Sequence, residues 1–326
     1  MTRADQFAGA ALLDKGGKTL FAKAFGMASR DRKAANALET RFNLGSINKI
    51  FTAVAIQQLD QAGRLRVDDT IHRYLLDYPA EYAKKITIRM LLEHRAGVPD
   101  VLESESLWKN PEAVRTTSGW YELIRDRPLN FEPGTKQEYS NGGYAILGMI
   151  VERASGEDYY AYMRKHVFAP AGMTRTDSYT IEDRKNGFAM GYSHHPGTAP
   201  PPSRDADAGV WYASPHMLGR GSAAGGGYST VGDMLRFAQA LREHKLLDAA
   251  HTERVIGKEA ELGIAGGSPG CNALLELSGP YTLVVLANVD PPAAERFAKT
   301  TGRMIRSAGG RGGGPRQVIR TVGGAH

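Results

Sequence analysis

Segments with the pattern of β-strands lie at both ends of this 326-residue chain, and helix-like segments fill the middle. Residues 7–13 and 19–26 are short apolar runs joined by the turn Asp-Lys-Gly-Gly-Lys, a pattern typical of a β-hairpin. Residues 272–277 and 281–288 form a second pair around Ser-Gly-Pro. The simplest architecture pairs the strands of both ends in one antiparallel sheet and places the helical middle in a second lobe, with a cleft between the lobes. We therefore predict an α/β fold of the α+β type.

Helical periodicity covers most of the region between these ends. The segments that show it are residues 46–62, 88–94, 120–125, 142–155, 159–167 and 230–247, and a last helix is expected over residues 292–306. Residues 183–227 are instead rich in proline and glycine, which predicts a long loop of the kind that is usually functional or mobile. From residue 308 onward glycine and arginine predominate, which favours a flexible tail.

Composition argues against several functional classes. The net charge of +6 is modest, basic residues are mixed with acidic ones, and no basic stripe carries interleaved aromatic residues, so we expect no nucleic-acid partner. No run of about 18 apolar residues occurs, which predicts no membrane span. The first five residues lack the apolar region of a signal peptide, so we expect either a cytoplasmic protein or a sequence without its export signal. The single cysteine, Cys271, excludes an internal disulfide, and the oligomeric state is left open.

Ser46 and Lys49 open the predicted helix of residues 46–62. Their spacing of three places a hydroxyl and an amine on one helical face, close enough to exchange a proton. A serine needs an adjacent base to act as a nucleophile, and burial can lower the lysine pKa from its usual value of about 10.4 so that lysine serves as that base. The alternative is that Ser46 is an ordinary helix cap. Ser106 and Lys109 have the same spacing, but their polar surroundings indicate a surface loop.

Tyr139 and Asn141 lie on a predicted loop directly before the helix of residues 142–155. Tyr139 is a candidate general acid/base, because two nearby lysines would make its phenolate accessible despite the usual tyrosine pKa of about 10. Asn141 is a candidate hydrogen-bond donor to the substrate and to lysine. The alternative is that Ser140 or Asn141 caps the helix and that Tyr139 only packs against it.

A glycine-rich segment, residues 263–270, precedes the predicted strand of residues 272–277. Glycines let a ligand approach the backbone of an edge strand closely, so this segment is a candidate binding element. The alternative is a loose β-turn.

In this order, the three segments resemble the motifs of the serine β-lactamase and penicillin-binding-protein-like superfamily, especially its class C-like branch, which also holds esterases and D-aminopeptidases. That superfamily uses Ser-x-x-Lys, then Tyr-x-Asn or Ser-x-Asn, then a Lys-Thr-Gly or His-x-Gly strand motif. Three further segments are similar to it, residues 40–46, 91–99 and 222–230. The resemblance covers about residues 7–306.

The resemblance also implies a domain organisation. It implies one catalytic domain over residues 1–306, with a sheet lobe of about residues 1–45 and 228–306 and a helical lobe of about residues 46–227. The active site would lie in the cleft between these lobes. Residues 307–326 would form a tail rich in glycine and arginine.

What the resemblance implies for the reaction is a two-step acyl transfer. Ser46 would be the nucleophile, and Lys49 with Tyr139 would take its proton during attack on a small-molecule ester, amide or β-lactam. Tyr139 would then protonate the leaving group and activate the water that releases the acyl group. Asn141 would position Lys49 and the substrate amide. No metal or organic cofactor is implied.

The third motif departs from the family pattern. Its first position, lysine or histidine in the family, is Ile264, followed by Ala265 and Gly266, while the oxyanion would lie between the backbone N–H groups of Ser46 and Gly267. No cation or hydroxyl then remains at the start of the motif to meet a substrate carboxylate, a loss of about 1.5–3 kcal/mol, or about 10- to 150-fold in binding. We therefore expect an esterase-type enzyme with weak or no β-lactamase activity.

Two other functions remain open. The first is a β-lactamase or D-Ala-D-Ala peptidase that binds its carboxylate elsewhere, through Arg204 or Arg220. The second is a catalytically weak relative that acts as a binding or scaffolding protein. Because the segment before the third motif is short, we also expect a sheet strand there to be missing or distorted, and the family's first helix would precede Phe7 and is not expected.

Overall fold

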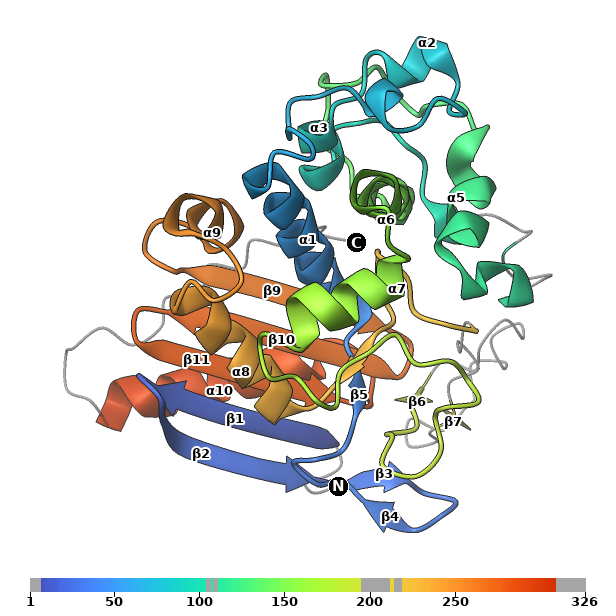
Figure 1. The fold of residues 1–326 in the computed structure, drawn as a ribbon. Coiled ribbons are helices and arrows are strands. Elements are labelled where there is room, and N and C mark those ends of the chain that lie inside the picture. The colour runs from blue at the N-terminus through green and yellow to red at the C-terminus, as the bar shows by residue number, and fades with distance from the viewer. Residues whose placement is uncertain (1–6, 104–106, 108–110, 195–211, 214–218, 309–326) are drawn as a thin grey trace.

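One antiparallel sheet of five strands organises the fold (Figure 1). The structure is a computed structural model that describes residues 7–103, 107, 111–194, 212–213 and 219–308. In spatial order the strands are β2 (Lys18–Phe25), β1 (Gly9–Lys15), β11 (Tyr281–Ala287), β10 (Cys271–Ser278) and β9 (Leu262–Ser268). β1 pairs antiparallel with β11 along its whole length. The predicted joining of both chain ends in one antiparallel sheet is therefore confirmed.

Helices cover both faces of this sheet, so its central strands are buried on two sides. Alternate residues of β1 face two different cores: Ala10 and Leu12 belong to the larger one, Ala11 and Leu13 to the smaller one. Helix α8 supplies Phe237 to the larger core, and α10 lies on the opposite face over the smaller one (Figure 1). The bounds of these helices are Val231–Arg242 for α8 and Ala293–Ala308 for α10.

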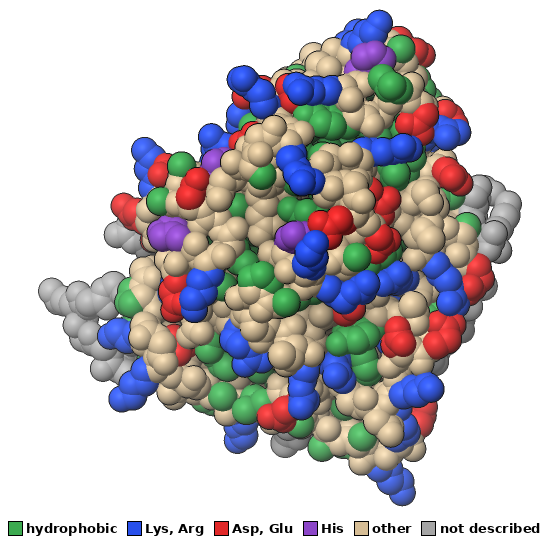
Figure 2. All heavy atoms as spheres, in the orientation of Figure 1, with side chains coloured by type: hydrophobic (Ala, Val, Ile, Leu, Met, Phe, Trp, Pro, Cys, Tyr) green, Lys and Arg blue, Asp and Glu red, His purple; other side chains and the backbone are tan. Residues whose placement is uncertain are grey.

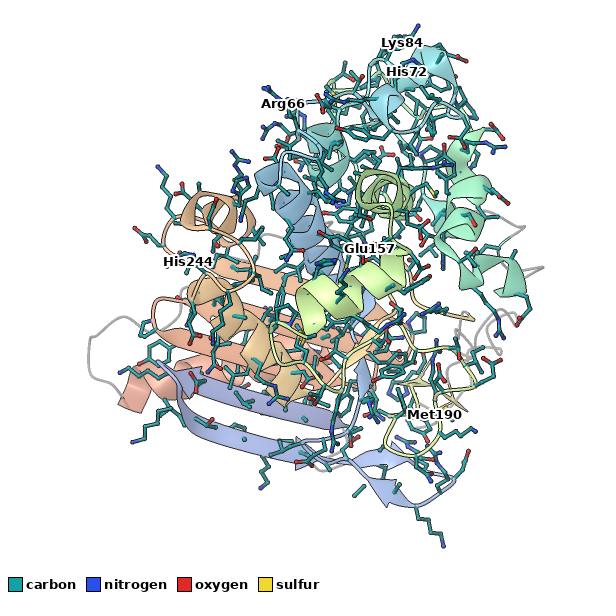
Figure 3. All side chains as sticks on the ribbon, in the orientation of Figure 1. Arg66, His72, Lys84, Glu157, Met190 and His244 are labelled. Atoms are coloured by element: carbon teal, nitrogen blue, oxygen red, sulfur yellow. The ribbon has the colours of Figure 1, made fainter. Side chains whose placement is uncertain are left out.

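The remaining helices form a helical region that adjoins the sheet (Figure 1). They are α1 (Lys49–Gln61), α2 (Ala80–Ala83), α3 (Ile88–Leu92), α5 (Thr117–Arg125), α6 (Asn141–Ser155), α7 (Tyr159–Tyr162) with a π-helical continuation (Met163–Phe168), and α9 (Ala249–Ile256). The larger core runs without a break from Leu12 of the sheet to Phe51 of α1 and Ile146 of α6, and Figure 3 shows the side chains of this region on the ribbon. α1 and α6 are therefore fixed to the sheet and to each other.

Short strands and 3₁₀ turns complete the described chain. The strands are β3 (Met27–Ser29), β4 (Ala34–Ala35), β5 (Phe42–Asn43), β6 (Tyr192–Ser193), β7 (Tyr212–Ala213) and β8 (Tyr228–Ser229). The 3₁₀ turns are Gly45–Asn48, Ile71–Arg73, Val101–Glu103 and Pro111–Arg115. β5 pairs with β8 and so joins the segment before Ser46 to the segment before α8.

The structure differs from the sequence-based expectations most at β9 and at the helix predicted over residues 230–247. β9 is a full strand paired with β10 from Ser268 opposite Cys271 to Leu262 opposite Leu277, so the expected missing or distorted strand is wrong, as is the alternative of a loose turn. The predicted helix of residues 230–247 ends at Arg242, and α9 follows as a separate helix capped by the Asp248 side chain. Much of the predicted loop of residues 183–227, and the predicted tail, lie outside the described residues.

None of the described helices is long and apolar enough to cross a membrane. On the face shown in Figure 2, lysine and arginine side chains are intermixed with aspartate and glutamate side chains.

Candidate active site

Ser46 lies in a tight 3₁₀ turn, Gly45–Asn48, that leads directly into α1. The side chains of Ile47, Ile50 and Phe51 are buried and anchor this turn and the start of α1 on the core. Ser46 is half-buried, and its hydroxyl contacts the side chains of two other candidate residues rather than a helix-end N–H. The alternative that Ser46 is merely a helix cap is therefore wrong.

The hydroxyl of Ser46, the phenol of Tyr139 and the amine of Lys49 meet in one cluster. Ser46 Oγ lies 2.7 Å from Tyr139 Oη and 3.3 Å from Lys49 Nζ. Lys49 Nζ also forms a hydrogen bond with Tyr139 Oη. These groups come from two separate motifs, and together they offer a continuous hydrogen-bonded path from the serine to the amine.

Lys49 is fully buried, with a relative exposure of 0%. Its Nζ donates to Asn141 Oδ1 at 2.7 Å and to the backbone carbonyl of Ala224 at 2.6 Å. Burial penalises the ammonium form and lowers the pKa of Lys49 from 10.5 to about 7, while the Asp100 carboxylate acts in the opposite direction. A large fraction of Lys49 is therefore a neutral amine at neutral pH.

Burial has the opposite effect on Tyr139, because it penalises the phenolate. It raises the pKa of Tyr139 to about 12, and the hydrogen bond with Ser46 only partly offsets this. The expectation that two lysines make the phenolate accessible is therefore wrong: Lys49 contacts the phenol, while the family's second cation is replaced by Ile264. Tyr139 keeps its proton in the neutral range and can pass a proton between its two neighbours.

Asn141 is held between Lys49 and the carboxylate of Asp100. Its Oδ1 accepts a hydrogen bond from Lys49, so the expectation that Asn141 donates to lysine is wrong. Its Nδ2 instead donates to Asp100, at 2.9 Å from Oδ2 and 3.2 Å from Oδ1. The neighbouring Ser140 caps α6, since its Oγ accepts the N–H of Gly143 at 3.1 Å. The capping alternative is thus confirmed for Ser140, which leaves the side chains of Tyr139 and Asn141 available to the site.

His94 supports the ring of Tyr139. The two ring centroids are 4.7 Å apart, and His94 Nδ1 accepts the backbone N–H of Ser140 at 3.2 Å. Burial, together with the nearby charge of Lys49, lowers the pKa of His94 to about 3. His94 is therefore a neutral packing partner rather than a proton donor at neutral pH.

Sequence reasoning missed three of these partners: Asp100, His94 and the carbonyl of Ala224. His94 ends the predicted helix of residues 88–94, Asp100 directly follows the segment 91–99, and Ala224 lies in the segment 222–230; the last two segments were noted for their family resemblance. Asp100 and Ala224 lie in irregular segments, so no periodicity indicates that they face the site.

Strand β9 brings its backbone against the turn that carries Ser46. A Cβ atom at Gly266 would lie 2.2 Å from the Leu44 carbonyl oxygen and 2.8 Å from Ser46 N, so only glycine permits this approach. A Cβ atom at Gly45, where φ is +50°, would lie 2.8 Å from Gly267 N. The backbone nitrogen of Gly267 therefore lies beside the serine turn. An oxyanion site needs a second backbone N–H group close to that of the nucleophile. The role of the Gly267 N–H as this group stays a prediction.

Ile264 lies two residues before Gly266 on the same strand. Its side chain is 1% exposed, belongs to the larger core and stands opposite Leu275 of β10. It supplies neither a charge nor a hydrogen bond. Direct contact of Ile264 with a substrate stays a prediction, and this burial does not favour it.

Arg220, a further candidate from the sequence, is engaged with other groups. Arg220 donates from Nε to the Ser178 carbonyl at 2.8 Å, and its guanidinium lies 3.4 Å from the centre of the Tyr160 ring. Arg204 and Ser106 lie outside the described residues.

A fold in which an antiparallel sheet and a helical region enclose a Ser-x-x-Lys turn defines the class of β-lactamase and transpeptidase-like proteins. A family model described as "Beta-lactamase" matches residues 2–304. The chain therefore belongs to the β-lactamase family, and this places it among serine hydrolases related to penicillin-binding proteins.

Individual relatives agree with this membership. The chain is 30% identical over 255 residues to "Penicillin-binding protein 4*" of Bacillus subtilis, a match that covers 76% of this chain and 55% of the relative. It is similar to the crystal structure of a penicillin-binding protein from Bacillus halodurans, with a TM-score of 0.78, 27% identity and coverage of 92% and 99% of the two chains. A D-amino acid amidase from Ochrobactrum anthropi SV3 shares the fold, with a TM-score of 0.73, 22% identity and coverage of 94% and 99%.

Proposed function

We propose that this chain hydrolyses ester or amide bonds through an acyl-enzyme on Ser46. The observation that carries the proposal is the chain of contacts from Ser46 Oγ through Tyr139 Oη to the buried amine of Lys49. A base with a pKa near the working pH is the best proton acceptor, and Lys49 has a pKa of about 7. Lys49 is therefore the base, and Tyr139 relays the proton.

The hydrogen bonds of Lys49 are compatible with a neutral amine. A neutral amine has two N–H groups and one lone pair. Asn141 Oδ1 and the Ala224 carbonyl are acceptors only, so they take the two N–H groups. The lone pair is then left for the hydrogen of Tyr139 Oη, which in turn can accept the hydrogen of Ser46 Oγ.

In the acylation step, Ser46 Oγ forms a bond to the carbonyl carbon of the substrate as its proton passes through Tyr139 to Lys49. The backbone N–H groups of Ser46 and Gly267 stabilise the oxyanion. When the tetrahedral intermediate collapses, the carbonyl–leaving-group bond breaks and the leaving group takes the proton back from Tyr139 and Lys49. Water then repeats the sequence on the acyl-enzyme and releases the acid, with Ser46 regenerated.

For the substrate, we propose an ester or amide without a carboxylate beside the scissile bond. The start of the third motif holds the uncharged residues Ile264 and Ala265, and Arg220 is engaged with Ser178 and Tyr160. The rival is a penicillin-binding or D-amino-acid-amidase activity of the kind that the names of its relatives carry. Because the match spans only about half of the first of these relatives, its whole-protein function is not transferred.

The test is a panel of substrates with detection of the covalent adduct. Wild-type protein and Ser46→Ala are incubated with p-nitrophenyl esters, a chromogenic cephalosporin and a D-Ala peptide, and intact-mass and peptide mass spectrometry locate acyl-Ser46. We expect ester turnover and an adduct in the wild type alone. Ester turnover that survives in Ser46→Ala would contradict the mechanism, and preferred turnover of the cephalosporin or the D-Ala peptide would favour the rival. No turnover and no adduct with any substrate would favour a binding protein.

The pH dependence follows from the direction of the Lys49 shift. The reactive form is the neutral amine, whose pKa is lowered to about 7, so activity is present above that value and lost below it. With an uncharged ester, kcat/KM should fall about tenfold per pH unit below pH 7 and stay level above it. Tyr139, with a pKa of about 12, adds no loss in the neutral range. A midpoint near 10 in the pH profile would contradict the lowered pKa of Lys49, because that is the ordinary range of a lysine.

A further inference from the structure

Asp100 lies behind Asn141, which separates it from Lys49. Its carboxylate accepts from Asn141 Nδ2 at 2.9 and 3.2 Å, from the backbone N–H of Asn141 at 3.3 Å and from the backbone N–H of Leu102 at 2.9 Å. Its backbone carbonyl accepts from Arg127 at 3.0 Å. Several backbone contacts from different residues therefore hold this carboxylate in place.

A carboxylate only accepts hydrogen bonds, so it decides which end of the Asn141 amide faces it. The amide has to turn its NH₂ group towards Asp100, and its oxygen is thereby directed at Lys49 Nζ. Without this partner, only Lys49 and Tyr139 would remain to orient the amide, and its two ends have nearly the same shape.

The orientation matters because of the lone pair on Lys49. With the amide oxygen towards Lys49, one N–H of the neutral amine is used there and the lone pair remains for Tyr139. With the amide reversed, Asn141 would donate to Lys49 and occupy the lone pair that the serine proton needs. The side chain of Asp100 thus controls a base that it does not touch.

We propose that Asp100 is a positioning residue for the acyl-transfer reaction, which locks the Asn141 amide so that Lys49 keeps its lone pair directed at Tyr139 and Ser46. The proposal rests on the proposed function of Ser46 and Lys49. It also assigns the amide nitrogen of Asn141 to Asp100, where the family resemblance had assigned this side chain partly to the substrate.

Asp100→Asn is the first test, because it keeps the shape of the side chain and removes the obligatory acceptor. With an uncharged ester we expect kcat to fall about 10- to 100-fold, with KM little changed. Loss of the negative charge should also move the acidic limb of the pH profile to lower pH, since Asp100 raises the pKa of Lys49. The matched control is Asp126→Asn, whose exposed carboxylate pairs with Arg125, and we expect wild-type kinetics from it.

The other titratable groups that face Lys49 are neutral near pH 7. Tyr139 and Tyr144 present their rings to Nζ at 4.6 and 5.4 Å, and burial raises the pKa of both phenols. Burial and the charge of Lys49 keep His94 neutral. A displaced acidic limb in Asp100→Asn therefore reports on Lys49.

Exchanging the carboxylate of Asp100 and the amide of Asn141 gives a second, independent test. In the double variant Asp100→Asn/Asn141→Asp, the amide at position 100 can donate to the carboxylate at position 141, which still presents an oxygen to Lys49. On the plateau above the acidic limb, we expect this exchange to recover at least about tenfold of the kcat lost in Asp100→Asn. The acidic limb should now move to higher pH, because the carboxylate contacts Lys49 directly. A residue that served folding alone would show no recovery.

Titration of the Lys49 side-chain resonances by NMR needs no substrate and separates this proposal from the proposed function. We expect a lower midpoint in Asp100→Asn than in the wild type and a higher one in the double variant. Unchanged kcat and an unchanged Lys49 midpoint in Asp100→Asn would overturn the positioning role, even if acyl-Ser46 forms. Absence of acyl-Ser46 in the wild type would instead overturn the proposed function, and the NMR midpoints would still report on the link from Asp100 to Lys49.

Discussion

Replacing Lys49 by methionine is expected to lower kcat/KM for an uncharged ester about a thousandfold to ten-thousandfold. Methionine has a similar length and suits a position with 0% exposure, but its thioether cannot take the proton of Ser46. Tyr139 cannot replace the lost base, because burial raises its pKa to about 12. The measurement is steady-state hydrolysis of a p-nitrophenyl ester, with acyl-Ser46 formation followed by mass spectrometry.

The same change leaves two buried acceptors without their donor, namely Asn141 Oδ1 and the Ala224 carbonyl. Each unsatisfied group costs about 1–3 kcal/mol, so thermal unfolding is recorded and activity is compared well below the lower midpoint. Lys245→Met, at an exposed lysine paired with Glu243, is the matched control and should behave as wild type. A Lys49→Met protein that stays folded and hydrolyses the ester within tenfold of wild type would remove Lys49 from the mechanism.

The sequence predicted those parts of the site that begin regular elements. Ser46 and Lys49 precede and open an apolar helical pattern, and Tyr139 and Asn141 stand at the start of another, so their position relative to the core follows from periodicity. α1 and α6 share the larger core, and this shared core brings the two motifs together.

The other parts of the fold and of the site could not be predicted because they depend on irregular segments and on glycines. Asp100 and Ala224 reach Asn141 and Lys49 from segments without a repeating pattern, so their contacts depend on tertiary packing alone. In β9 the glycines hide the alternation that marks a strand, although these glycines let the strand lie against the serine turn. The sequence did not predict α9. This helix begins after its cap residue Asp248, which lies six residues after the end of α8 at Arg242.

Gly266→Ala should impair both the fold and the reaction, because the new Cβ atom would lie 2.2 Å from the Leu44 carbonyl oxygen and 2.8 Å from Ser46 N. Both contacts are with backbone, so either β9 or the serine turn has to move. Overpacking of this kind costs about 1–3 kcal/mol of stability. Displacing the Gly267 N–H from the developing oxyanion should lower kcat about 10²- to 10³-fold, as loss of one oxyanion donor does.

Gly232→Ala separates this effect from a general cost of adding a methyl group. Gly232 is the second residue of α8, and the nearest atoms to an added Cβ are 3.8 Å away, so alanine should be neutral or stabilise the helix by up to about 1 kcal/mol. Thermal unfolding and kcat are measured for both variants with the same ester. A loss of stability without a loss of kcat in Gly266→Ala would show that β9 yields without disturbing the oxyanion site. If Gly266→Ala keeps both the stability and the kcat of the wild type, β9 does not approach the Ser46 turn closely. The assignment of Gly267 to the oxyanion site would then fail as well.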